Sequence, residues 1–333
     1  MKSLVTGGAG FIGSNLVDLL VSKGHKVIVL DNFSTGRKLN LLHHTKNNVK
    51  IVNVDISTTK KLDKYFKDVN YVFHMAGLAD IVPSIENPDR YFKSNVIGTF
   101  NILQALKGTK IKKFIYAASA SCYGFPKKFP TSENSEIKPM YPYAFTKWQG
   151  EELVMHWFKI YNFPAISLRF FNCYGPRSRT SGVYGAVFGV FLAQKLAKKP
   201  LTIVGEGEQT RDFVHVKDLV RAVFKAAISK KIGKIYNVGG AKEVKVNKIA
   251  KLIGGKSIHI PKRPGEPNRS LADIRYIKKD LSWRPKIKIE DGVKDLLKNI
   301  KYWKNAPVWT PTKINKATKI WFKLLKKKEL DEK

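Results

Sequence analysis

The sequence has little cysteine and no long apolar run. Its 333 residues contain two cysteines, Cys122 and Cys173, which are too few for a disulfide framework. We expect both thiols to be packing residues in a reducing, cytoplasmic location. No apolar stretch is long enough for a transmembrane helix, and the first residues, MKSLVTGGAGFIG, reach glycines too early for a signal peptide. These absences predict a folded cytoplasmic protein.

Acidic residues are also scarce. The chain has 61 Lys and Arg against 26 Asp and Glu, a formal net charge of +35. Such a charge attracts anions of any kind, including nucleotides, nucleic acids and acidic membranes. The lysines are spread along the whole chain, and no concentrated aromatic-basic module of the RNA-binding type is present. We therefore expect no specific nucleic-acid partner, and we assign no metal site.

The first residues have the pattern of a dinucleotide-binding turn. Residues 2–6 predict a strand, GGAGFIG follows, and residues 14–23 have helical periodicity. Glycines at this spacing let the backbone approach a pyrophosphate at the start of a helix. A second strand, 26–30, leads to Asp31, whose carboxylate is suited to ribose hydroxyls and repels the extra phosphate of NADP. NAD is therefore the predicted cofactor, although the nearby Arg37 is compatible with NADP.

Strands and helices continue to alternate up to about residue 170. Strands are predicted at 49–54, 71–75 and 113–118, with helices at 60–66 and 89–106. This alternation predicts a parallel, doubly wound α/β sheet, which binds ligands outside the carboxyl ends of its strands. Most residues expected to bind the cofactor lie at such positions: Gly7, Gly10, Phe11, Ile12, Gly13, Asp31, Asn32, Asp55, Ile56, Met75, Ala76 and Gly77. Three further residues expected to bind it lie on predicted helices: Asn95, Tyr143 and Lys147.

Tyr143 and Lys147 are the candidate acid/base pair. They lie four residues apart in YPYAFTKWQGEE, so on a helix they share one face. A free phenol has a pKa near ~10, and a neighbouring ammonium group lowers it. We therefore predict that Lys147 lowers the pKa of Tyr143 and makes it a general acid/base. Ser119, at the end of the 113–118 strand, is the third candidate catalytic residue.

Taken together, these motifs resemble the extended short-chain dehydrogenase/reductases of the nucleotide-sugar epimerase and dehydratase family, closest to UDP-hexose 4-epimerases. The resemblance covers roughly residues 1–303. Its motifs are the glycine turn, DNFSTGR (31–37), HMAG (74–77), NVIGT (95–99), SASCYG (119–124), YxxxK (143–147), RFFNCYGPR (169–177), TRDFVHVKD (210–218) and RPGEPNRSLAD (263–273).

The resemblance implies a Rossmann-like domain over residues 1–170 and a smaller C-terminal α/β domain over 171–303 that mainly binds substrate. A helix at 214–230 is expected to pack back on the first domain. In the second half, a strand at 163–171 and an apolar helix at 186–198 flank a loop at 178–185. A hairpin is predicted over 200–213, and Tyr236 is expected to begin the last segment of the substrate domain.

The resemblance also implies a mechanism. Tyr143, as a phenolate beside Lys147, removes the proton of the sugar 4-hydroxyl while the C4 hydride passes to NAD, and Ser119 hydrogen-bonds the same oxygen. The 4-keto sugar then turns over and takes the hydride back on its other face. The implied substrate is a UDP-sugar, and the implied assembly is a homodimer formed through helices near Asn95 and Tyr143.

Two neighbouring positions bear on the reaction type. Dehydratases of the family place an Asp–Glu pair after the catalytic Ser or Thr, and decarboxylases carry a Glu at the second position. Here the residues are Ala120 and Ser121, which cannot exchange protons as carboxyl groups do. Epimerisation is therefore favoured over 4,6-dehydration and decarboxylation, while epimerisation of a different nucleotide sugar stays an alternative. The intact Ser119, Tyr143 and Lys147 argue against the non-enzyme alternative, an NAD-binding scaffold that associates with nucleic acid. Ala79 departs from the lysine that glucose-type epimerases often have.

Five residues are implied to bind the substrate: Ser121, Asn172, Arg211, Arg263 and Ser270. The two arginines suit the diphosphate, because guanidinium groups match phosphate oxygens. Ser270 matches a position that borders the sugar C2 substituent. A small residue there admits an N-acetyl group, which makes UDP-N-acetylglucosamine, or its uronate, a candidate substrate beside UDP-glucose.

Residues 307–333 lie beyond the usual end of the family. Apolar side chains recur at helical spacing and lysines occupy the opposite face, which predicts a basic amphipathic helix. The apolar residues are Ile314, Ala317, Trp321, Leu324 and Leu325. Such a helix either contacts an anionic membrane surface or, as the simpler interpretation, packs on its own domain or on a dimer partner.

Overall fold

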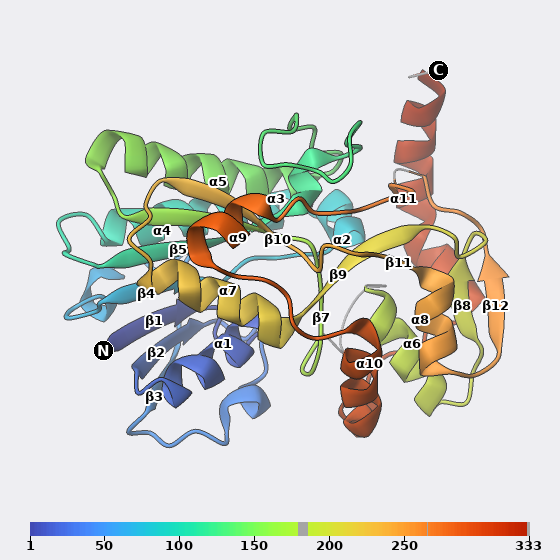
Figure 1. Cartoon of the computed structure of the whole chain (residues 1–333), viewed down its shortest axis with the longest axis horizontal. Helices are drawn as coiled ribbons and strands as arrows, with labels where there is room; N and C mark the ends of the chain where they lie inside the picture. The colour runs from blue at the N-terminus through green and yellow to red at the C-terminus, as the bar shows by residue number, and fades with distance from the viewer. Residues whose placement is uncertain (179–185, 265, 332–333) are drawn as a thin grey trace.

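A seven-stranded parallel sheet forms one half of the computed structural model, which describes residues 1–178, 186–264 and 266–331. The strand order is β10-β6-β5-β4-β1-β2-β3, and each pair is parallel. The strands are β1 (Lys2–Thr6), β2 (Lys26–Asp31), β3 (Val49–Asn53), β4 (Tyr71–His74), β5 (Lys113–Ser119), β6 (Ala165–Phe170) and β10 (Lys234–Val238). Helices lie on both faces of this sheet (Figure 1), which confirms the predicted doubly wound α/β fold.

One face of the sheet is covered by α1 (Phe11–Ser22), α7 (Val216–Ile228) and α9 (Arg275–Leu281). Leu16 and Leu20 of α1 are fully buried in the same core as Leu219 of α7. The helix expected at 214–230 therefore packs back on the first half. The next strand, β10, pairs with β6 at the edge of the large sheet, although Tyr236 was expected to begin a segment of the substrate half.

The other face is covered by α3 (Pro88–Phe92), α4 (Gly98–Ala105) and α5 (Pro142–Tyr161). A π-helical turn, Lys93–Ile97, joins α3 to α4, so the helix predicted at 89–106 is continuous but contains a bulge. The helix predicted at 60–66 is wrong, because this segment contains only a 3₁₀ turn at Asp63–Tyr65. Residues 60–66 contribute Leu62 and Phe66 to the core through this turn.

The second half contains two small sheets. The first has β7 (Asn172–Tyr174), β9 (Thr210–His215) and β11 (Glu243–Lys245), and the second has β8 (Leu201–Val204) and β12 (Ser257–Ile260). The hairpin predicted over 200–213 is therefore wrong, because β8 and β9 belong to different sheets. The surrounding helices are α6 (Val187–Leu196), α8 (Val246–Ile253) and α10 (Ile289–Lys298). The loop expected at 178–185 lies, from residue 179 on, outside the described residues.

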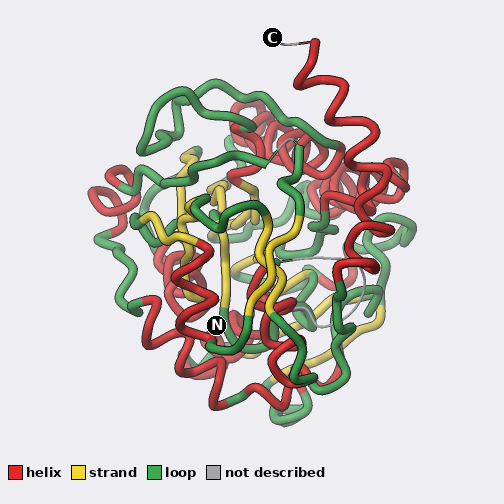
Figure 2. The backbone as a smooth tube through the Cα atoms, turned by 90° about the vertical axis from the view of Figure 1, so that its right-hand side faces the viewer, coloured by secondary structure: helices red, strands yellow, loops and turns green. Residues whose placement is uncertain are grey.

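The tail forms the predicted helix, α11 (Pro311–Asp331), and its apolar face packs on the same chain. Trp321 and Leu325 are buried against α2 (Ile81–Glu86), while Leu324 is 49% exposed. The last turns of α11 extend away from the body of the molecule (Figures 1 and 2). Among the described helices, none combines the length and the apolar character needed to cross a membrane.

Candidate active site

A cavity of about 700 Å³ lies at the carboxyl ends of the large-sheet strands and extends toward the second half. All the predicted catalytic, cofactor and substrate residues line it except Asn95. Residues from the glycine turn after β1 and from β5, α5, β7 and β9 meet there, so the fold brings together segments that are more than 200 positions apart in the sequence. The cavity is therefore the candidate active site.

The glycine turn fits a pyrophosphate. Gly7 has φ +67°, a conformation that favours glycine, and a Cβ on Gly13 would overlap the Gly7 carbonyl oxygen. Helix α1 begins at Phe11 with no side-chain cap and no acidic residue in its first turn, so its positive end faces the cavity without a competing carboxylate of its own. These features match the close backbone approach that a dinucleotide needs.

Asp31 connects the end of β2 to this turn. Its Oδ2 accepts a hydrogen bond from the Ala9 amide at 2.9 Å, and its Oδ1 accepts one from the Phe33 amide at 2.8 Å. Burial raises the pKa of Asp31, and these two bonds lower it in part. Asp55 lies at the next strand end, where its carboxylate accepts a hydrogen bond from the Asn32 amide at 2.9 Å. The two acidic residues predicted to bind the cofactor thus both border the cavity.

Three hydroxyl groups that line the cavity form a short chain of hydrogen bonds. The Tyr143 hydroxyl donates to Ser119 Oγ at 3.1 Å, and Ser119 Oγ lies 2.7 Å from Ser121 Oγ. Burial raises the pKa of Tyr143, while its contacts with Ser119 and Ser121 lower it in part. The expected lowering by Lys147 is therefore wrong for the protein alone, because desolvation of the phenol dominates.

Lys147 is itself strongly affected by its surroundings. It is 6% exposed, and its Nζ lies 4.4 Å from the centre of the Tyr116 ring. Burial lowers the pKa of Lys147 to about 7, and Glu151, one turn further along α5, opposes part of this shift. A buried lysine whose pKa is lowered toward neutrality, one helical turn from a half-buried phenol, is the kind of group that acid/base sites contain.

Asn95, the remaining predicted cofactor residue, lies behind the cavity lining. Its side chain is 1% exposed and faces the protein, accepting a hydrogen bond from the Leu78 amide at 2.8 Å. It also donates to the Leu78 carbonyl at 3.1 Å and to Thr146 Oγ1 at 3.0 Å. Asn95 therefore fixes the stretch after β4 against α5, and its amide does not line the cavity.

A buried ion pair holds α5 against β6. The Arg169 guanidinium donates to Glu151 Oε1 from Nη2 at 2.6 Å and from Nε at 3.0 Å, and Ser167 donates to Glu151 Oε2 at 2.6 Å. Arg169 also donates to the Tyr123 hydroxyl at 2.9 Å. This network links α5, which carries Tyr143 and Lys147, to the segment that follows Ser119.

The two predicted diphosphate arginines share one carboxylate. Arg263 Nη1 lies 3.1 Å from Glu266 Oε1, Arg211 Nη2 lies 3.9 Å from Glu266 Oε2, and Arg211 also donates to the Pro267 carbonyl at 2.8 Å. Glu266 was not among the predicted residues, although its place three positions after Arg263 in RPGEP was a usable signal. Ser270 and Asn172 line the same cavity.

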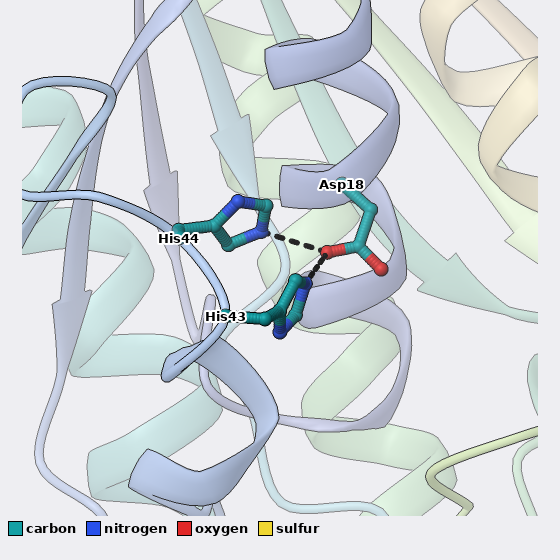
Figure 3. Close-up of side chains that lie close together, drawn as sticks. All are labelled: Asp18, His43 and His44. Carbon is teal, nitrogen blue, oxygen red and sulfur yellow. Dashed lines mark hydrogen bonds and ion pairs between the residues drawn. The ribbon is translucent and has the colours of Figure 1, made fainter.

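Asp18, His43 and His44 form the one group, in the part of the chain that the structure describes, with the composition of a metal site. Nε2 of each histidine lies 2.8 Å from Asp18 Oδ1 (Figure 3). Arg177 pairs with the other oxygen of Asp18. Burial raises the pKa of Asp18, but Arg177 and the histidines lower it further. Because a guanidinium already neutralises this carboxylate, we interpret the group as a polar contact between α1, the histidine segment and the cavity-lining Arg177.

Comparisons with known proteins agree with this geometry. A family model described as the NAD dependent epimerase/dehydratase family matches residues 3–239. A putative UDP-glucose 4-epimerase of Methanocaldococcus jannaschii is 38% identical over 87% of this chain and 95% of its own length. UDP-glucuronic acid decarboxylase 4 of Arabidopsis thaliana is 33% identical over 90% of this chain and 69% of its own. The solved UDP-N-acetylglucosamine 4-epimerase of Methanobrevibacter ruminantium M1 has a TM-score of 0.84 at 33% identity, covering 90% of this chain and 98% of its own.

Proposed function

We propose, from the premise that the chain belongs to the NAD-dependent epimerase/dehydratase family and uses NAD, that it inverts C4 of a UDP-hexose. The observation that carries this proposal is the hydroxyl chain from Tyr143 to Ser119 and Ser121 in the cavity, with Lys147 buried one turn away. Relatives in the family include both 4-epimerases and UDP-glucuronic acid decarboxylases, so the residues of the site must decide between these reactions.

The residues next to Ser119 favour epimerisation. Decarboxylation and 4,6-dehydration each need an additional acid or base near the sugar ring. The Ser121 hydroxyl forms a hydrogen bond with the Ser119 hydroxyl, and the Ala120 side chain has no polar group. Neither side chain can act as a carboxyl group does. A 4-epimerase needs a single proton carrier at the C4 oxygen, which is what this site offers.

In the proposed reaction, Tyr143 accepts the proton of the sugar 4-hydroxyl and Ser119 holds the same oxygen. NAD, if held by the glycine turn and Asp31, would take the C4 hydride and give it back to the other face of C4, and its positive charge would favour ionisation of a nearby phenol. Tyr143 returns the proton after the 4-keto sugar has turned within the cavity. Arg211 and Arg263 hold the diphosphate throughout, so that the sugar turns while it stays attached.

Our proposal for the sugar substrate rests on Ser270, which the resemblance matches to a position beside the sugar C2 substituent. Ser270 lines the cavity and is small, which leaves room for an N-acetyl group. We therefore propose UDP-N-acetylglucosamine as a substrate beside UDP-glucose. Proton NMR of the anomeric signals, with each nucleotide sugar incubated separately with the protein, tests this directly. A new galacto-configured signal supports the proposal. A 4-keto-6-deoxy product or a pentose product would refute it.

We also propose a homodimer formed through α3, α4 and α5. Large apolar side chains on these helices are exposed, with Phe92 at 41%, Phe145 at 42% and Tyr161 at 58%. The Phe100 ring packs edge-on against Trp157 on the same surface, with ring centres 5.8 Å apart. Such a patch favours association between copies. Light scattering of the wild type and of Phe100→Glu tests this, with a dimer expected for the first and a monomer for the second.

A further inference from the structure

The tail helix α11 connects both halves of the molecule across the cavity. Ile314, in its first turn, is 4% exposed and belongs to the core of the second half. Trp321 and Leu325, two and three turns later, are buried against Val82 of α2. Helix α2 follows the cavity-lining stretch after β4 and itself lines the cavity through Ile81 and Val82. One helix thus holds the first half and the second half together beside the site.

Trp321 is the residue of α11 that reaches the substrate side. Its indole N–H donates to the Pro264 carbonyl at 2.8 Å, and its ring lies 5.6 Å from the Arg263 guanidinium carbon. The side chain is 3% exposed and lines the cavity. A guanidinium at this distance from an indole face is attracted to it. Trp321 therefore fixes both the backbone after Arg263 and the guanidinium itself.

The segment that Trp321 contacts also holds Arg211. Glu266 lies 3.1 Å from Arg263 Nη1 and 3.9 Å from Arg211 Nη2, and Arg211 donates to the Pro267 carbonyl at 2.8 Å. The backbone that Trp321 holds at Pro264 is thus the backbone on which both guanidinium groups depend. If Trp321 is lost, this segment gains freedom that binding of the diphosphate must then remove.

We propose that Trp321 is a positioning residue for the diphosphate site, and that α11 sets the affinity for the nucleotide sugar rather than the rate of the chemical step. The proposal rests on the proposed function, in which Arg263 and Arg211 bind the diphosphate. It gives a physical reason for a helix beyond the usual end of the family: the helix holds the arginine segment in its binding conformation before substrate arrives.

The test compares Trp321→Phe with Leu325→Ala. Phenylalanine keeps an aromatic ring over Arg263 but cannot donate to Pro264, whereas Leu325→Ala removes apolar packing from the same helix and leaves both contacts in place. For Trp321→Phe we expect Kd for UDP, measured by calorimetry, and KM for the UDP-sugar to rise about fivefold, the equivalent of one neutral hydrogen bond. The kcat and Kd for NAD stay within about twofold, as expected when binding of the ground state and of the transition state is weakened equally. Trp321→Ala, which also loses the ring, shows a rise of at least about tenfold.

Leu325→Ala lowers the melting temperature and leaves Kd for UDP unchanged. Equal losses of UDP affinity in the two variants would overturn the proposal, because they would mean that the helix acts only through stability. A parallel loss of NAD affinity, or no change in Trp321→Phe, would overturn it too. If the wild type binds UDP in a Trp321-dependent manner but converts no UDP-sugar, the positioning role is supported and the proposed epimerase function fails. If the wild type does not bind UDP, both fail.

Discussion

Replacing Glu151 by Gln tests how the catalytic helix is held in place. The Glu151 and Arg169 side chains are 1% and 4% exposed, and the carboxylate accepts hydrogen bonds from both Arg169 and Ser167. The substitution keeps the shape of the side chain but leaves the buried guanidinium without its negative partner. Breaking a buried pair in this way costs about 3–5 kcal/mol, so we expect a loss of that size in the free energy of unfolding.

The assay is urea unfolding followed by circular dichroism, with Asp89→Asn as the matched control. Asp89 pairs with Lys93 one helical turn away, but these side chains are 72% and 66% exposed. Such a solvent-screened surface pair contributes little to the free energy of unfolding. A double variant, Glu151→Leu with Arg169→Met, removes both charges and should recover at least half of the loss. If Glu151→Gln costs no more than Asp89→Asn, the interpretation of this network as a structural support of α5 is refuted.

Three further predictions address the site. Tyr143→Phe should lower kcat by about 10²–10⁴, the contribution of a positioned acid/base, with an unchanged melting temperature; a loss below tenfold would contradict the assigned role. Burial, aided by Lys147, lowers the pKa of His74 to about 3 from 6.5, so the unfolded chain binds a proton that the folded chain does not. As the pH falls from 6.5 to 4.5, the stability advantage of wild type over His74→Gln should therefore shrink, with a slope that approaches about 1.4 kcal/mol per pH unit below about pH 5.5, as read from urea midpoints, whereas a constant difference would exclude a neutral native His74. Ser270→Tyr should lower kcat/KM for UDP-N-acetylglucosamine by at least about tenfold and change that for UDP-glucose by less than about threefold, and equal losses on both sugars would contradict the C2 argument.

The sequence was sufficient for the parts of the site that depend on local patterns. The glycine turn, Asp31 and the Tyr143–Lys147 pair each lie at a boundary between a strand and a helix, or on one helix face, so their spacing indicates their geometry. The predicted parallel sheet followed from the same alternation. Prediction of the fold class therefore required no long-range information.

Features that depend on distant segments could not be predicted in this way. Burial of Tyr143 comes from segments outside its own helix, so the direction of its pKa shift was wrong. The pairing of β10 with β6 and the contact between Trp321 and Pro264 join residues more than 50 positions apart. Hydrophobic periodicity predicted which face of α11 is apolar, but it carries no information on which surface covers that face.

The position of α7 on the large sheet, and of β10 at the edge of that sheet, determines how the molecule unfolds. The chain leaves the first half after β6, returns to it as α7 and β10, and leaves it again, so no single cut separates the two halves. A fragment ending near residue 170 would lack the strand that pairs with β6 and the helix that covers Leu16 and Leu20. We therefore expect such a fragment to aggregate when expressed alone, and the intact chain to unfold in one cooperative transition rather than domain by domain.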